Sequence, residues 1–175
     1  MVLKDLLSGE GRRKFRTERN TKKLLERYAQ SEMRMEAAEK LKTIGTPDAI
    51  YGLARRFSAT AENLGIDQDE KQFIRDTLIS FGSEAIEPCI RYIRNYDQVT
   101  WAIQVLEKLQ STDELVAFLF DILHEGDPVY IRGEKATQIL RALEALDHPD
   151  VVSGVIPCLK SADDTVRNAA VECLE

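Results

Sequence analysis

Residues that mark several protein classes are scarce in this 175-residue chain, which has 5 Pro, 9 Gly, 3 Cys, 2 His and 1 Trp. The cysteines Cys89, Cys158 and Cys173 are odd in number and never form a C-x-x-C pair. Cys89 and Cys158 fall on expected apolar helix faces, so we interpret them as buried thiols in a reducing cytoplasm; a redox or ligand role is the alternative.

Long apolar runs and targeting signals are also missing. No stretch approaches the eighteen apolar residues of a membrane span, and the first residues lack the length and cleavage site of a signal peptide. We therefore expect a cytoplasmic protein with no membrane span.

Catalytic signatures are equally sparse. The chain has neither a phosphate-cradling glycine loop nor a G-x-S-x-G elbow. Its two histidines, His124 and His148, stand next to expected helix ends, and His124-Glu125 is an isolated pair. We therefore expect no metal site, no cofactor and no enzymatic activity.

A recurring helical phrase is what the chain does have. In its fullest copy, Arg34 is followed by Ala37, Ala38, Leu41 and Gly45. The anchoring apolar residues, separated by 37, 28, 37 and 31 residues, are Leu41, Leu78, Leu106, Leu143 and Leu174. A base stands seven residues before the anchor at Arg34, Lys71 and Arg167, and an acid seven residues after it at Asp48, Asp113 and Asp150. A shared period near the low thirties is typical of repeated helix pairs.

Capping residues and apolar spacing predict an all-α fold. Thr46-Pro47-Asp48 supplies an N-cap hydroxyl, a first-turn proline and an acid facing the helix dipole, and Asp127-Pro128 and His148-Pro149-Asp150 repeat that pattern. Apolar residues between such starts recur at helical spacing, and no alternating segment indicates a strand. The expected helices span 16–20, 22–30, 31–44, 47–58, 69–81, 83–94, 98–109, 113–124, 129–146, 149–160 and 163–175, and the first two can be one helix.

The quoted phrase resembles the HEAT repeat family, in particular its short bacterial, PBS-lyase-like form. The resemblance covers about 28–175, is fullest at 34–53, and departs from the family pattern at 99–123, where Gln110 and Val99 replace the Gly and the base. It implies a right-handed α-solenoid of about five antiparallel helix pairs, an armadillo-like superhelix whose second helices line a concave face. It also implies a scaffold that binds proteins, since such arrays serve many unrelated clients.

Charge is distributed unevenly along the chain. Residues 1–27, which we call the leader, carry nine Lys/Arg against four Asp/Glu, a net of +5, and 28–175 carry fifteen against twenty-six, a net of −11. The basic residues that could meet an anionic partner are Arg12, Arg13, Lys14, Arg16 and Arg19. Nucleic acid, an anionic lipid surface or an acidic protein would suit them, and the alternative is a solvated, partly disordered leader that covers the first repeat.

Candidate partner-binding residues lie in the array. Trp101, flanked by Gln104 and Lys108, falls beside the apolar seam of its helix and could be a half-exposed hot spot or pack against a neighbouring repeat. Arg34, Lys71, Arg75 and Arg167 could form a basic stripe along the groove, or pair with the recurrent acids between repeats.

Three functions are compatible with these features. The main hypothesis is a non-catalytic scaffold that binds a protein or peptide along the concave face. The alternatives are an accessory subunit of bilin-lyase type and nucleic-acid binding through the leader, which the −11 body opposes. The chain stops within an expected helix, which predicts either a piece of a longer array or end-to-end self-association.

Overall fold

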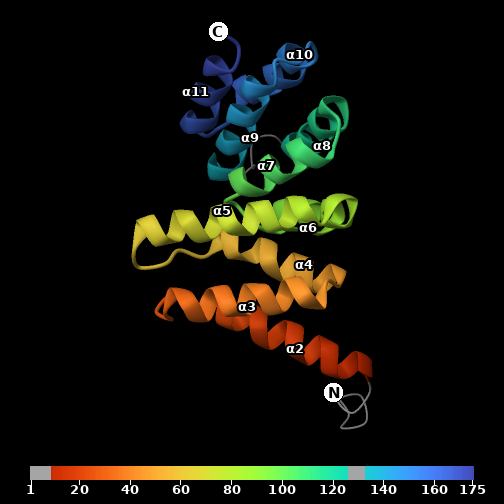
Figure 1. Cartoon of the computed structure of the whole chain (residues 1–175). Coiled ribbons are helices and arrows are strands. Elements are labelled where there is room, and N and C mark those ends of the chain that lie inside the picture. Colours follow the sequence, from red (N-terminus) through yellow and green to blue (C-terminus); the bar gives the residue numbers. More distant parts are fainter. Residues whose placement is uncertain (1–8, 126–132) are drawn as a thin grey trace. The chain divides into compact units, whose positions relative to one another are not determined.

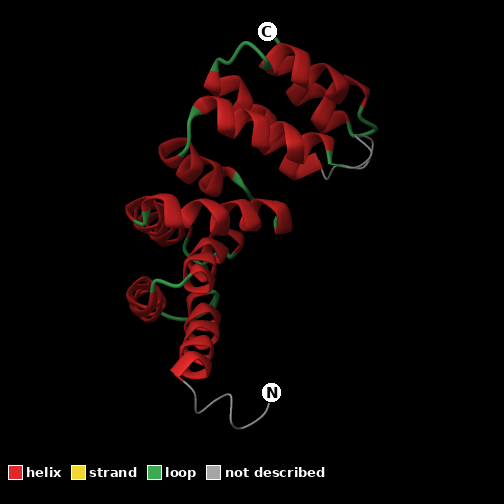
Figure 2. Ribbon diagram, turned by 90° about the vertical axis from the view of Figure 1, so that its right-hand side faces the viewer, coloured by secondary structure: helices red, strands yellow, loops and turns green. Residues whose placement is uncertain are grey.

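The computed structural model describes residues 9–125 and 133–175, and these ranges form helices joined by turns and short loops (Figure 2). No β-strand occurs in the described part of the chain, so the all-α prediction is confirmed. None of the helices in these two ranges is both long and apolar enough to cross a membrane.

The α-helices follow one another in the order labelled in Figure 1. They are α2 (Gly9–Leu24), α3 (Ser31–Ile44), α4 (Pro47–Ala54), α5 (Leu64–Ser80), α6 (Ile86–Asn95), α7 (Thr100–Leu109), α8 (Thr112–His124), α9 (Gly133–Leu146), α10 (Val151–Val155) and α11 (Asp164–Glu172). Short 3₁₀ segments, η1 (Arg55–Ser58), η2 (Gly82–Ala85) and η4 (Ile156–Lys160), extend α4, precede α6 and extend α10.

The chain divides into two compact units, one ending at Tyr92 and the other beginning at Ile93, so the boundary falls inside α6. The expected boundary between a leader (1–27) and an array (28–175) stays a prediction. Since α2 packs against α3 and α4, the described part of the leader belongs to the first unit.

In the first unit, turn chemistry and apolar burial agree with the sequence. Gly45 adopts a left-handed φ of 62° and donates its N–H to Leu41 O, which ends α3. Thr46 then caps α4 by accepting the Ala49 N–H, as its position before Pro47 predicts. The core is fully buried and comprises Leu24, Leu41, Ile50, Leu53, Phe57, Ile74, Leu78 and Tyr92, among others.

In the second unit, α7 and α8 begin in different ways. Ser111 and Glu114 form a capping box at the start of α8, each side chain accepting the other's backbone N–H. At the start of α7, Val99 offers no side-chain cap, and Gln138 of α9 accepts the N–H groups of Val99 and Thr100 instead. A helix start in one element is thus completed by a side chain from another.

Four of the five anchoring leucines and two of the cysteines are buried, as predicted. Leu41 and Leu78 are fully buried in the first unit, and Leu106 and Leu143 in the second, while Leu174 is partly exposed. Cys89 and Cys158 are buried and unpaired, and burial raises the pKa of Cys89 to about 12.

Some expected helix bounds are wrong. The expected segments 16–20 and 22–30 do form one helix, as the sequence allowed, but this helix, α2, begins earlier, at Gly9, and ends earlier, at Leu24. Helix α5 begins at Leu64 rather than 69, because Asn63 Oδ1 accepts the Ile66 N–H and starts the helix earlier. The Asp127-Pro128 start and the beginning of the expected helix 129–146 lie outside the described residues.

Candidate binding groove and buried ion-pair cluster

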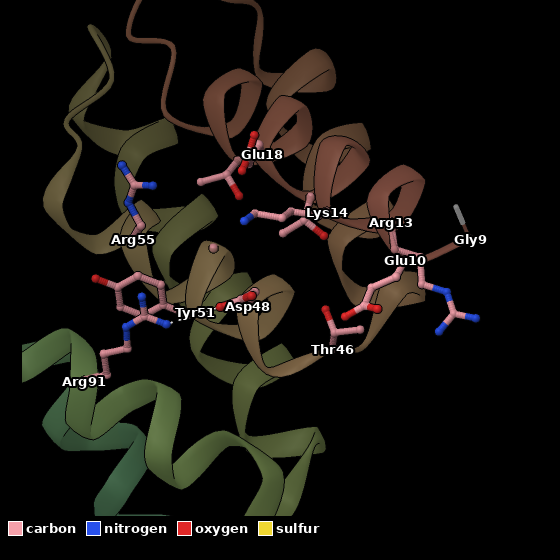
Figure 3. A pocket seen from close by; sticks show the side chains of 13 residues that line it. Gly9, Glu10, Arg13, Lys14, Glu18, Thr46, Asp48, Tyr51, Arg55 and Arg91 are labelled. Carbon is pink, nitrogen blue, oxygen red and sulfur yellow. Dashed lines mark hydrogen bonds and ion pairs between the residues drawn. The ribbon is translucent and has the colours of Figure 1, made fainter. Parts of the chain in front are cut away.

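A hollow of about 790 Å³ lies between α2 and α4 in the first unit (Figure 3). Its charged and aromatic lining comes from α2, α4, η1 and α6, and comprises Glu10, Arg13, Lys14, Glu18, Asp48, Tyr51, Arg55 and Arg91. A second hollow of about 470 Å³ adjoins the first, because Glu18 and Arg55 border both. We call the two hollows together the α2 groove.

Helix α2 reaches α4 because one of its faces is small and polar. Its buried residues are Thr17, Asn20, Thr21 and Leu24, and only the last is apolar. Opposite them, Gly52 of α4 has no side chain, and a Cβ there would lie 2.4 Å from Thr21 Oγ1. The two backbones therefore approach closely at Gly52.

The α4 wall of the groove carries an aromatic ring held by a cation. The Arg91 guanidinium lies 4.1 Å from the centroid of the Tyr51 ring, within the range of a cation–π contact. Arg91 Nη1 also lies 3.2 Å from Asp48 Oδ1. Both charged side chains are more than half exposed, so the pair adds little stability.

Four charged residues recur at every fourth position of α2 and line the groove: Glu10, Lys14, Glu18 and Lys22. We call this alternating series the α2 ladder. Residues four apart share a helix face and commonly pair, as Glu36 and Lys40 do at 2.6 Å on α3. Within residues 9–125 and 133–175, no ion pair or hydrogen bond engages the ladder side chains. Figure 3 shows Lys14 extending into the space between α2 and α4.

A second feature of the first unit is a buried cluster of three bases and two acids, joining α3, η1 and α5: Arg34, Arg56, Lys71, Asp67 and Glu70. Glu70 accepts from Arg34 Nη2 at 2.7 Å, from Arg56 Nη2 at 2.9 Å and from Ser31 Oγ at 2.6 Å. Asp67 contacts Arg56 Nη2 at 2.6 Å and Lys71 Nζ at 2.8 Å. We call this set the buried cluster.

The cluster is charged despite its burial. Burial alone would raise the pKa of Glu70, but hydrogen bonds from Arg34, Ser31 and Arg56 outweigh it and hold that pKa below its ordinary value. Burial likewise opposes ionisation of Asp67, yet Lys71, the Ala61 N–H and Arg56 keep its pKa low. Hydrogen bonding to Glu70 raises the pKa of Arg34. Both carboxylates are therefore ionised at neutral pH, and the five charges sum to +1.

The recurrent bases of the first unit match neither interpretation, because Arg34 and Lys71 pair with Glu70 and Asp67, which are not among the recurrent acids. Arg34 and Lys71 are buried and paired with acids, so they do not contribute to an exposed basic stripe. Arg75 pairs with its neighbour Asp76 at 2.8 Å and remains partly exposed. In the second unit, Arg167 contacts Asp164 and donates to Ser161 O at 2.6 Å.

The other predicted residues lie at the surface or near it. Trp101 and Gln104 of α7 are partly buried and Lys108 is exposed, which leaves both interpretations of Trp101 open. The basic residues of the leader are exposed on α2, and they are Arg12, Arg13, Lys14, Arg16 and Arg19. Residues Gly9–Leu24 of the leader form helix α2, which packs against α3 and α4. Of its five candidate bases, Arg13 and Lys14 border the groove.

Sequence reasoning missed the α4 side of the groove and three of the five residues of the buried cluster. No sequence pattern predicts the contact between Tyr51 and Arg91, because 40 residues separate them in the chain. Arg56 stands beside Arg55 in the sequence, yet it is 1% exposed. The α2 ladder had a readable signal, the four-residue alternation of charge.

Comparisons with protein-family models, with curated proteins and with solved structures returned no match. Within the described residues, no group of three or more His, Cys, Asp and Glu side chains is arranged to hold a metal ion.

Proposed function

We propose that this chain is a HEAT-type helical-repeat scaffold whose α2 groove holds a peptide segment of a partner protein. In this proposal the helix pairs stack as a solenoid, and the recurring leucines Leu41, Leu78, Leu106 and Leu143 mark the repeat that stacks. The buried state of all four leucines supports the proposal, because each helix pair of such an array buries its anchor.

The observation that carries the proposal is the α2 groove itself. Helix α2 has 16 residues, which corresponds to a length of about 24 Å, enough for about seven residues of an extended chain. The groove combines the aromatic ring of Tyr51, over which Arg91 lies, with the α2 ladder, whose side chains form no ion pair among the described residues. Such a combination suits a peptide, whose aromatic or aliphatic side chain would cover Tyr51 while its polar groups meet the ladder.

Site-specific photo-crosslinking tests the proposal without assuming a partner sequence. A photoreactive phenylalanine analogue is placed at Tyr51 in the full chain, and at Lys42, an exposed residue of α3 outside the groove, as the matched control. The protein is irradiated in cell extract and the products are identified by mass spectrometry. The expected result is a discrete protein product formed from position 51 and absent from position 42.

The same experiment carries two further arms. Lys14→Glu, at the centre of the ladder, should diminish the position-51 product, and Trp101→Ala in the second unit should leave it intact. Equal products from positions 51 and 42, or loss with Trp101→Ala alone, would place the binding surface elsewhere and overturn the assignment. A nucleic acid as the only product would replace a protein partner with a nucleic-acid one.

A further inference from the structure

The α2 ladder presents charges of alternating sign at a fixed spacing, and a ligand with complementary charges at a matching spacing can pair with them. A rise of 1.5 Å per residue places successive ladder residues about 6 Å apart along α2, and Glu10 and Lys22 about 18 Å apart. Alternate side chains of an extended peptide project to the same side about 6.6 Å apart. The two spacings differ by less than the reach of a Lys or Glu side chain, so every second residue of an extended peptide can meet one ladder residue.

The uncharged floor of the groove favours an extended ligand over a helical one. Docking a helix lengthwise requires an apolar stripe on both helices. Between the ladder and α4, the groove offers Thr17, Thr21 and Gly52, which provide little apolar surface. An extended chain, by contrast, can place its backbone over such a narrow polar floor and project side chains to either wall.

Resting on the proposed function, we propose that the α2 groove selects an extended partner segment whose acidic and basic residues alternate at every second position, in the order that opposes the ladder. The ligand segment reads Lys-x-Glu-x-Lys-x-Glu against Glu10, Lys14, Glu18 and Lys22. The order of the charges, rather than their sum, determines which segment binds. An array of pairs gains this specificity because each misplaced charge replaces an attraction by a repulsion.

The ladder charges can pair with a ligand because they form no ion pair with one another in the described structure. Glu10 could pair with Lys14, and Glu18 with Lys22, in the orientation that stabilises isolated helices. Neither pair forms at ion-pair distance in the described structure, whereas Glu36 and Lys40 on α3 do pair. An incoming ligand therefore need not break an internal ion pair at any rung.

Two synthetic peptides of identical composition test the proposal against the full-length protein. Both carry a fluorophore and alanine or serine spacers; one alternates Lys and Glu at every second position, and the other groups the lysines in one half and the glutamates in the other. Fluorescence anisotropy at low salt should show the alternating peptide binding at least about tenfold more tightly, with affinity that falls as salt is added.

Charge reversal then locates the contact. Lys14→Glu should weaken binding of the alternating peptide, and a second peptide with Lys in place of the Glu that opposes Lys14 should restore it. Lys42→Glu, an exposed lysine outside the groove, should change nothing, and far-UV circular dichroism should show equal helicity in both variants.

Several results would overturn the inference. Equal affinity for the two peptides would mean that net charge or apolar contact selects the ligand; if position 51 still crosslinks a protein, the proposed function stands and only the charge order fails. If neither peptide binds, or if only a labelled nucleic acid binds, the proposed selection by charge order is also refuted. Loss of the position-51 product together with either result would end both proposals.

Discussion

Replacing Glu70 by Gln tests whether the buried cluster holds the first unit together. The substitution preserves the size of the side chain and removes one negative charge. In the native chain the Glu70 carboxylate accepts hydrogen bonds from Ser31, Arg34 and Arg56, and the Glu70 side chain is 3% exposed. With Gln, the cluster would hold three cations and one acid, and its net charge would rise from +1 to +2.

The expected cost follows from the burial of the cations left behind. Arg34 and Arg56 are 4% and 1% exposed, so neither can exchange the lost carboxylate for bulk water. Removing one partner of a buried ion pair destabilises a protein by about 3–5 kcal/mol. A domain is stable by only about 5–15 kcal/mol, so the substitution should remove a large share of the stability of the first unit.

Urea unfolding followed by far-UV circular dichroism measures the loss, and hydrogen exchange resolved along the chain assigns it to α3 and α5. The matched control is Glu36→Gln, which breaks the exposed pair with Lys40 and should leave the unfolding midpoint nearly unchanged. A loss for Glu70→Gln below about 1 kcal/mol would refute the reasoning, since it would mean that water or a rearranged partner neutralises the two guanidinium groups.

Two other predictions concern the same unit. The pKa values of Glu70 and Asp67 are lower in the folded than in the unfolded chain. The two ionised carboxylates therefore stabilise the folded chain fully above pH 4.5, the ordinary pKa of Glu70, and this stabilisation is lost as the pH falls through the folded pKa values. Between these pH values, the unfolding free energy of Glu70→Gln should change less with pH than that of the wild type. Gly52→Ala would place a Cβ 2.4 Å from Thr21 Oγ1 and should cost about 1–3 kcal/mol in thermal or chemical unfolding. Gly65→Ala, with only Asn63 Oδ1 nearby at 3.4 Å, should cost nothing. If Gly52→Ala were as harmless as Gly65→Ala, the close approach of α2 to α4 would be wrong.

The helix pattern of the chain was largely predictable where apolar residues recur at helical spacing. Thr46 and Pro47 fix the start of α4, and Gly45 fixes the end of α3. The bounds of α2 were predicted wrongly because its buried face is polar: Thr17, Asn20 and Thr21 pack against the neighbouring helices without an apolar signal. Burial of such small polar groups depends on the surface they meet, which no local pattern records.

The start of α5 failed for the opposite reason. Leu64 and Ile66 are 70% and 39% exposed, so the first turn carries apolar residues on the solvent side and obscures the periodicity. The correct start depends on a local polar contact, the acceptance of the Ile66 N–H by Asn63. For the start of α5, the capping residue was a more reliable signal than the apolar periodicity.

The recurrence of a base seven residues before each anchor did indicate a shared position, although not its role. Arg34 and Arg167 each donate to a carbonyl of the turn that precedes their helix, Ala29 O and Ser161 O. Lys71 instead pairs with Asp67 one turn earlier on the same helix. The sequence could not show that Arg34 also meets Glu70, 36 residues away, because only the packing of α3 against α5 brings them together.

The buried cluster and the α2 groove are connected through Arg34. One of its nitrogens, Nη1, donates to Ala29 O and to Glu26 O, both in the turn that joins α2 to α3, while Nε and Nη2 bind Glu70. The same guanidinium therefore joins the turn after α2 to the centre of the first unit. This turn therefore adds to the packing of α2 against α3 and α4, which sets where the ladder lies. The cluster thus contributes to the groove by fixing the position of one wall, and a rigid wall is what a ligand read by the order of its charges requires.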